Sequence, residues 1–472
     1  METERFGSAQ RWVLALASVA AVMITLDALV VTTALNTIRR DLGASLSSLE
    51  WTLNAYALSY AALMMTGAAL GDRLGRRRIF IAGLALFTAA SAACALAPGI
   101  GWLIAARVVQ GAGGAMIMPL AMSLVSTAFG PRQRARAMGI FSGVMGLGVL
   151  GGPVVGGAVS QALSWQWIFW LNVPLGVLMI PLVRMRVTES VGNRSRLDLV
   201  GVGLVTVAAL AVVWGLVRGN TAGWASAGVI GSLVAGVVVA LAFIAWERRV
   251  SDPMLPMWLF RDRTFAATNF SGFFLFASNF GSVFFIAQYF QIVFGYSPLQ
   301  TGLHMLPWTT TLFVVAPIAG GLVSRWGARI LVTCGLTLQA IGLGEVALAA
   351  DLSTSYAALV PGLIVAGVGI SMAMPATQNA VVSAVPPAAI GKASGTFNTL
   401  RQLGGAFGVA LSVAIFSSAG SYGGAAAFTD GLVPALGGVA GLALLAAAAG
   451  VLMREPAPVV VTTAEPLVEA AH

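Results

Sequence analysis

Long apolar runs follow one another along nearly the whole chain, with only short polar segments between them. Each run is about 20 residues long, which is the length that an α-helix needs to cross the hydrocarbon core of a bilayer. We count fourteen runs, at 12–35, 50–70, 79–97, 102–128, 137–160, 166–183, 199–217, 224–246, 265–294, 301–323, 330–350, 355–382, 393–418 and 432–453. The pattern predicts an all-α integral membrane protein with fourteen transmembrane helices.

The composition agrees with a bilayer partner and argues against an enzyme. Hydrophobic residues make up 58% of the chain and charged residues 9%, whereas soluble domains carry about 25% charged residues. The net charge of +9 lies mostly in short loops between apolar runs, so we expect no nucleic-acid partner. The chain contains no H-E-x-x-H, G-x-S-x-G or P-loop motif. Cys94 and Cys334 lie in apolar runs, which predicts buried hydrophobes rather than a metal site.

The distribution of cations predicts the orientation. If the N-terminus is cytoplasmic, 21 of the 26 cations lie in inner loops or termini and three lie in outer loops. Such a bias follows the positive-inside rule. We therefore expect a multi-pass protein of the cell inner (plasma) membrane with both termini in the cytoplasm.

An internal repeat divides the chain. A shift of 252 residues maps Arg73, Gly75 and Arg77 onto Arg325, Gly327 and Arg329. Each half then contributes six spans, as in transporters that rock around a central cavity. The expected organisation is a cytoplasmic N-terminus (1–11), a six-helix bundle (12–196), an inserted two-helix pair (197–250), a second six-helix bundle (251–453) and a disordered cytoplasmic tail (454–472).

The segment GDRLGRRR at 71–78 concentrates charge in a chain that otherwise avoids it. One interpretation is topological, since the arginines would hold the loop inside. The glycine spacing and the embedded acid favour a gate instead: glycines permit a tight turn, and the Asp can form a charge-assisted lock. The predicted inner gate loop consists of Gly71, Asp72, Arg73, Gly75, Arg76 and Arg77.

Several motifs together resemble one known family. G-x-x-x-G-D-R-x-G-R-R-R at 67–78 is similar to the signature loop of the major facilitator superfamily. RVVQGAGGA (107–115) resembles its intramembrane-arginine motif, and GLGVLGGPVVGG (146–157) its antiporter motif. LDALVVTTAL (26–35) and WQWIFWLNVPLG (165–176) resemble the fourteen-helix drug:proton antiporter branch of EmrB/QacA type. The resemblance implies the major facilitator fold, with two extra helices between its six-helix bundles.

Ionisable residues inside spans are costly and are candidates for function. Asp27 lies roughly 12 Å below the outer end of the first span, and Arg107 roughly 9 Å below that of the fourth. Because the family's fold brings these helices to one cavity, we predict that the two side chains meet or share a water. Burial favours the neutral form of an acid, whereas a nearby arginine favours its charged form. A site balanced between the two effects can take up and release a proton. A permanent ion pair that only fixes helix packing is the alternative.

The fifth span carries the predicted antiporter motif of Gly148, Gly152, Pro153, Gly156 and Gly157. Its glycines form a small-residue face that permits close helix contact, and the proline interrupts one backbone hydrogen bond. Plain packing is one reading. By analogy with the family, the other is a bend that keeps the cavity from leaking.

The substrate cavity is predicted from aromatic and amide side chains at helical spacing, which suit bulky amphiphilic compounds. Arg401, near mid-span, either binds an anionic or polar substrate group or holds carbonyls of its own helix. Glu345 is expected at the membrane interface, and His304 at a helix mouth. The predicted lining is Met23, Asn54, Tyr56, Phe273, Phe276, Asn279, Phe280, Trp308, Asn398, Arg401 and Gln402.

These features predict a proton-coupled antiporter that exports lipophilic drugs or antibiotics by alternating access, with Asp27 as the coupling carboxylate. Asn279, its repeat partner, is uncharged, so coupling is expected in the first half alone. The expected partners are a small lipophilic substrate, protons and the lipid bilayer. We expect a monomer that needs no cofactor beyond the proton gradient. A dedicated transporter of a single metabolite on the same scaffold is the alternative.

Overall fold

The computed structural model describes residues 6–129, 131–191, 198–251, 253, 255, 257–386 and 390–454. Most of the expected tail and the first five residues lie outside this part. The described chain is helical: α1 (Ser8–Leu42), α2 (Leu46–Leu74), α3 (Arg76–Ala95), α4 (Ile100–Ala128), α5 (Pro131–Ala162), α6 (Trp167–Trp170), α7 (Asn172–Arg186), α8 (Leu199–Ala222), α9 (Ala227–Glu247), a 3-10 turn (Met257–Arg261), α10 (Arg263–Ile292), α11 (Pro298–His304), α12 (Leu306–Thr309), α13 (Thr311–Ala349), α14 (Tyr356–Ser383), α15 (Ile390–Ala419) and α16 (Ala425–Val451).

Most of the expected spans are present as long apolar helices. Twelve helices of the described residues are long and apolar enough to cross a membrane, and a thirteenth is α2, which bends by 45° between Ser48–Met64 and Thr66–Leu74. Not every side chain of α5 is described, and this helix is not part of that count. The total of fourteen spans therefore stays a prediction.

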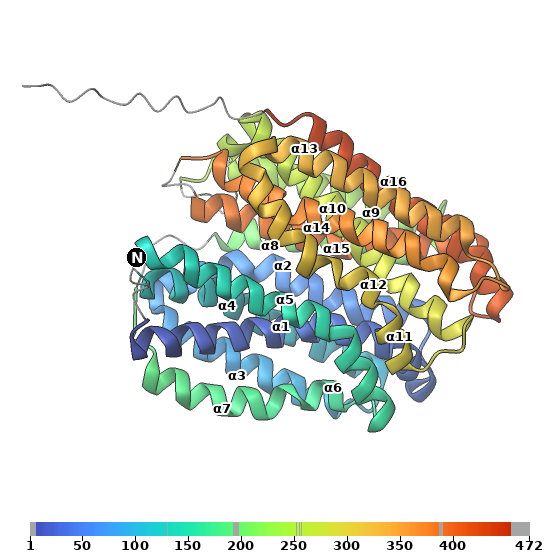
Figure 1. Cartoon of the computed structure of the whole chain (residues 1–472), viewed down its shortest axis with the longest axis horizontal. Coiled ribbons are helices and arrows are strands. Elements are labelled where there is room, and N and C mark those ends of the chain that lie inside the picture. Colours follow the sequence, from blue (N-terminus) through green and yellow to red (C-terminus); the bar gives the residue numbers. More distant parts are fainter. Residues whose placement is uncertain are drawn as a thin grey trace, which may run out of the picture.

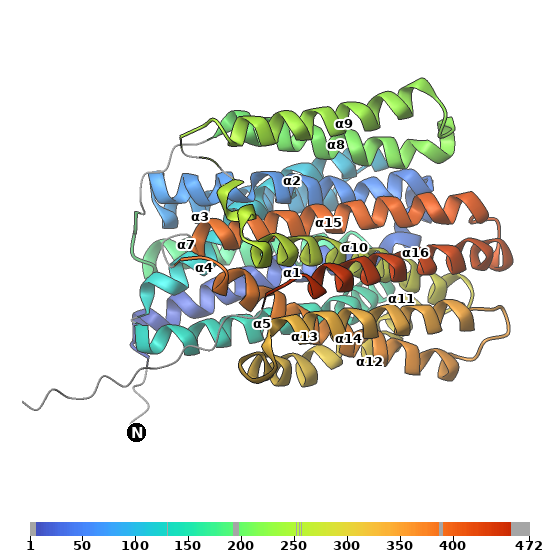
Figure 2. The same ribbon diagram turned by 90° about the horizontal axis from the view of Figure 1, so that it is seen from above.

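The helices form two bundles that lie side by side (Figure 1). Helices α1 to α7 pack on one another as the N-half, and α10 to α16 pack as the C-half. The packing partners correspond, because α1 packs on α5 as α10 packs on α15, and α3 packs on α7 as α13 packs on α16. The α8–α9 pair lies along one edge against α2 and α15 (Figure 2).

The repeated glycines of the sequence have related backbone conformations. Gly75, between α2 and α3, has φ 111° and ψ 125°, and Gly327, inside α13, has φ 77° and ψ 157°. Side chains rarely adopt such positive φ values, so glycine is required at both turns. The backbone kinks at Gly327, so the range labelled α13 contains parts of two spans, which correspond to those expected at 301–323 and 330–350.

The two halves are joined at the end of the molecule remote from the chain termini, which we call the closed end. Here the Asn36 amide of α1 donates to Gln291 Oε1 of α10 at 3.0 Å, and the Gln291 amide donates to the Thr33 carbonyl at 2.9 Å. The Arg39 guanidinium lies 4.3 Å from the ring centroid of Tyr422 in the C-half. Helix α1 therefore carries both the start of the chain and the polar contacts of the closed end.

Gly157 of α5 makes a second contact at the closed end. A Cβ atom at this position would run into the backbone of Pro298 and Leu299 in α11. Only a residue without a side chain permits this approach of the two backbones. By contrast, a Cβ at Gly151 on the same helix would meet only Val155 Cγ2, at 3.9 Å.

We expect Gly157→Val to weaken the closed end, because the added side chain must push α11 away from α5. A cysteine in place of Thr33, which is buried beside this contact, would report the change in a Cys94→Ser, Cys334→Ser background. Its labelling by a maleimide should become roughly threefold faster or more, as for other local openings. Gly151→Val is the matched control and should leave the rate unchanged; equal rates in both variants would contradict the contact's role.

Candidate functional site

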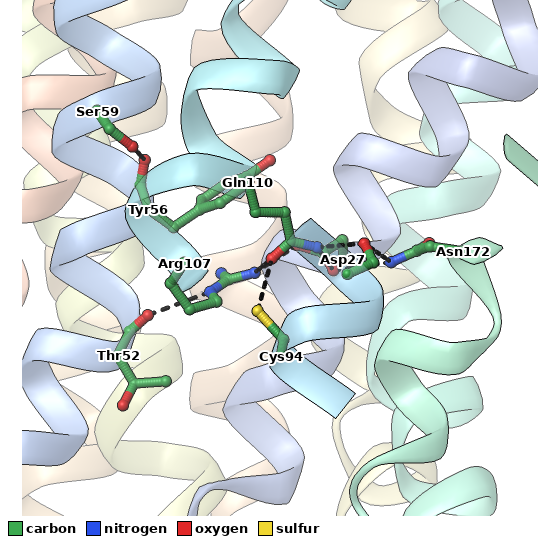
Figure 3. Close-up of polar contacts among 9 residues, drawn as sticks. Asp27, Thr52, Tyr56, Ser59, Cys94, Arg107, Gln110 and Asn172 are labelled. Atoms are coloured by element: carbon green, nitrogen blue, oxygen red, sulfur yellow. Dashed lines mark hydrogen bonds and ion pairs between the residues drawn. The ribbon is translucent and has the colours of Figure 1, made fainter. Parts of the chain in front are cut away.

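Asp27 of α1 and Arg107 of α4 form an ion pair inside the N-half. Arg107 Nη1 donates to Asp27 Oδ2 at 2.5 Å, and the residues are only 2% and 1% exposed. The structure therefore brings together the two charged groups for which the sequence predicts contact. Figure 3 shows them between α1 and α4, surrounded by polar side chains of neighbouring helices.

Two amides complete the contacts of the Asp27 carboxylate. Gln110 Nε2 donates to Oδ1 at 2.9 Å from α4, and Asn172 Nδ2 donates to the same oxygen at 3.0 Å from α7. Ser91 of α3 accepts from Gln110 at 2.8 Å. Each of these contacts to Asp27 is a donor, which is what an ionised carboxylate requires.

Arg107 has partners beyond Asp27. Its Nη1 also donates to Gln110 Oε1 at 2.7 Å, and its Nε donates to the carbonyl of Thr52 in α2 at 3.2 Å. The guanidinium lies 4.1 Å from the ring centroid of Tyr56, a cation–π geometry. Side chains or carbonyls from α1, α2, α3, α4 and α7 thus meet around one ion pair.

The sequence analysis missed the uncharged members of this cluster. Gln110 and Asn172 lie within the quoted segments RVVQGAGGA and WQWIFWLNVPLG, and a polar side chain inside an apolar run was the available signal. Glu50 of α2 was also missed; it is 2% exposed, and its Oε2 has no hydrogen-bond partner. It lies at the edge of the predicted second span, where an acid is easily taken for a loop residue.

The charges of the GDRLGRRR loop pair within the N-half. Asp72 Oδ1 forms an ion pair with Arg76 Nη2, four residues later, at 2.7 Å. Glu189, which follows α7, accepts from the backbone N–H of Arg77 at 2.9 Å and lies 3.7 Å from the Nε of both Arg77 and Arg78. Glu189 is thus a partner that the sequence analysis did not identify. A gating role for this loop stays a prediction.

Three glycines of the antiporter motif, Gly148, Gly152 and Gly156, face α1. A Cβ at Gly152 would meet Leu29 Cβ at 2.8 Å, and one at Gly156 would meet Val30 Cγ1 at 2.9 Å. Gly148 faces Val22 at 3.4 Å, while the side chain of Pro153 lies outside the described part. This glycine face sets how closely α5 and α1 approach over the stretch of α1 that includes Asp27.

The residues predicted to line one cavity lie in different parts of the structure. Phe276 of α10 lies under the Arg401 guanidinium at 4.6 Å, and its ring is 6.2 Å from that of Phe280. Phe273 packs on Phe407 of α15 at 5.5 Å. Met23 belongs to the core of the N-half, and Trp308 belongs to an apolar cluster that includes residues of both halves.

Polar members of the predicted lining also differ in their surroundings. Asn398 donates to the Ser394 carbonyl of its own helix at 2.9 Å, whereas both amide atoms of buried Asn54 have no hydrogen-bond partner. Asn279 and Gln402 are partly buried. Glu345 is exposed near one end of α13, as expected, and His304 Nδ1 lies 2.6 Å from the Gln300 carbonyl. Participation of each residue in a substrate site stays a prediction.

Removing one partner of a buried ion pair leaves an uncompensated charge, at a cost of about 3–5 kcal/mol. We expect Arg107→Met to lower the thermal unfolding temperature of the purified protein for this reason. The double variant Asp27→Leu, Arg107→Met should be more stable than the sum of the two single effects implies. Arg78→Met, which removes an exposed arginine, is the control. Strictly additive losses would show that the two groups do not interact.

Comparisons with known proteins agree with this architecture. Residues 16–409 match the model of the Major Facilitator Superfamily. The multidrug resistance protein Stp of Mycobacterium tuberculosis is 36% identical over 82% of this chain and 72% of its own. The methylenomycin A resistance protein of Streptomyces coelicolor is 35% identical over 90% of each chain. The tetracenomycin C resistance and export protein of Streptomyces glaucescens is 33% identical over 84% of this chain and 73% of its own.

Solved structures show the same fold. A bacterial homolog of the human lysosomal transporter Spinster matches with a TM-score of 0.68 at 16% identity, over 95% of this chain and 98% of that one. A peptide transporter, POT, matches with a TM-score of 0.70 at 15% identity, over 96% and 97%. The chain belongs to the major facilitator superfamily, and it is a multi-span membrane transporter rather than an enzyme.

Proposed function

We propose that the protein is a proton-coupled antiporter that exports lipophilic drugs or antibiotics by alternating access, with Asp27 as the coupling carboxylate. The relatives named for multidrug and antibiotic resistance support the export of drugs. The observation that carries the coupling role is the Asp27 carboxylate itself, which is buried and held by donors from α4 and α7.

The contacts of α1 link this carboxylate to the closed end. Thr33 and Asn36 lie six and nine residues after Asp27 on the same helix, or roughly 9 and 14 Å along its axis. While Asp27 is charged, Arg107 and Asn172 hold α1 against α4 and α7, and Gln291 holds its far end. Protonation weakens the first set of contacts and lets α1 move together with the closed end.

This linkage defines a cycle of exchange. The end that carries the arginine-rich loops and both chain termini faces the cytoplasm, as the positive-inside rule requires. The closed end then faces outward in this structure, and substrate enters from the cytoplasm while Asp27 is charged. Rocking of the two halves exposes Asp27 to the outside, a proton neutralises it, and substrate leaves. The proton is released inside after the return step.

Under this proposal, the protein works as a monomer in the plasma membrane of a bacterium. Lipophilic substrates suit the aromatic rings of Phe276, which lies under Arg401, and of the neighbouring Phe280. A transporter dedicated to one metabolite would share the scaffold and the proton site. A broad panel of transported dyes separates the two, since a dedicated transporter moves only one member.

We expect Asp27→Asn to reduce dye transport driven by an imposed pH gradient at least about tenfold in proteoliposomes, because the amide cannot exchange a proton. Dye exchange without a gradient should persist, since it needs only the substrate site and the rocking motion. The measurement is dye accumulation with and without the gradient.

Glu345→Gln is the matched control, because it removes an acid that is exposed near the end of a span. This variant should keep gradient-driven transport at the wild-type rate. Unchanged gradient-driven transport in Asp27→Asn would refute the coupling role.

A further inference from the structure

Arg401 of α15 is a partly buried cation without a polar partner among the described residues. The Phe276 ring lies beneath its guanidinium, 4.6 Å from the centroid. The hydrogen bonds and ion pairs of the described chain do not include Arg401. Its Nε is fully buried and unpaired, while the terminal nitrogens retain accessible surface.

This situation contrasts with that of the other intramembrane arginine. Arg107 is matched by a carboxylate, an amide and a carbonyl. A guanidinium inside a bilayer costs several kcal/mol unless it is paired or hydrated. An arginine that only stabilised its own helix would donate to nearby carbonyls, and Arg401 does not. Its terminal N–H donors are therefore available to a group outside the protein.

The surroundings of Arg401 fit a lipophilic ligand that carries one acidic group. Helix α15, which carries Arg401, packs on α2 where the two halves meet, and Tyr60 of α2 lies near the guanidinium. Phe280 extends the aromatic surface beyond Phe276. Tyr60 stacks on Tyr56 at 5.8 Å, and Tyr56 lies under Arg107. Because Asp27 neutralises Arg107, Arg401 supplies the net positive charge of this region.

We propose that Arg401 binds an acidic substituent, a carboxylate or an ionised phenol or enol, of an otherwise lipophilic substrate. The planar guanidinium can grip two oxygens at once, and a neighbouring ring of the substrate stacks on Phe276 and Phe280. This inference rests on the proposed export function, because the bound compound is a substrate only if the protein exports it. It makes acidic and zwitterionic compounds better ligands than their purely cationic analogues.

The test compares rhodamine B, which carries a carboxylate, with its ethyl ester, in which that charge is masked. Equilibrium binding to the purified protein is measured by fluorescence anisotropy without any gradient. We expect wild type to bind the carboxylate dye at least about tenfold more tightly. Arg401→Gln should remove the preference by weakening the carboxylate dye alone, and Arg401→Lys should retain part of it.

Three results would overturn the proposal: no preference for the carboxylate dye, binding of neither dye, or an equal loss for both in Arg401→Gln. If the glutamine variant does not fold, competition on wild-type protein by benzoate against benzyl alcohol gives the same decision, since only benzoate should displace rhodamine B. Binding needs no proton gradient, so Asp27→Asn should keep the preference. A failure of proton coupling is thereby distinguished from a failure of the Arg401 site.

Discussion

The structure depends on one ion pair that water cannot reach. Asp27 and Arg107 are each costly to bury, and their mutual attraction offsets that cost only because further hydrogen bonds satisfy the remaining atoms. Gln110, Asn172 and the Thr52 carbonyl supply those bonds from α4, α7 and α2. Four helices must therefore be in register for the pair to exist.

Helix α1 is held at three places along its length. The ion-pair cluster holds its middle, the glycine face of α5 packs along its side, and Gln291 binds its far end. At Gly152 and Gly156 an added Cβ would collide with α1, so the two helices are in close contact there. Since α5 also touches α11 through Gly157, both contacts at the closed end involve this helix pair.

Sequence alone predicted the helices and the charged pair well, for physical reasons. Apolar runs of bilayer length are a strong signal, and charges inside them are few enough that Asp27 and Arg107 could be matched by depth. Partners without charge could not be found this way. Gln110, Ser91 and Asn172 are ordinary polar residues until helix rotation brings them to one point. Glu189 pairs with Arg77 across 112 residues of sequence, and nothing in the local pattern near either residue indicates that contact.

The two halves share a helix framework but differ in the charged residues that they carry inside the membrane-spanning helices. In the N-half, Gly111 packs on Tyr56 and Ser59; in the C-half, Gly367 packs on Trp308 and Thr311 in the same way. Four residues before these glycines lie Arg107 and the buried Leu363. Asp27 likewise corresponds to Asn279. The C-half therefore has no equivalent ion pair at this position. Its own intramembrane arginine, Arg401, lies over Phe276 and has no polar partner among the described residues. Under the proposed function, the proton would bind in the N-half and the acidic group of the substrate in the C-half, so the two would not compete for one group.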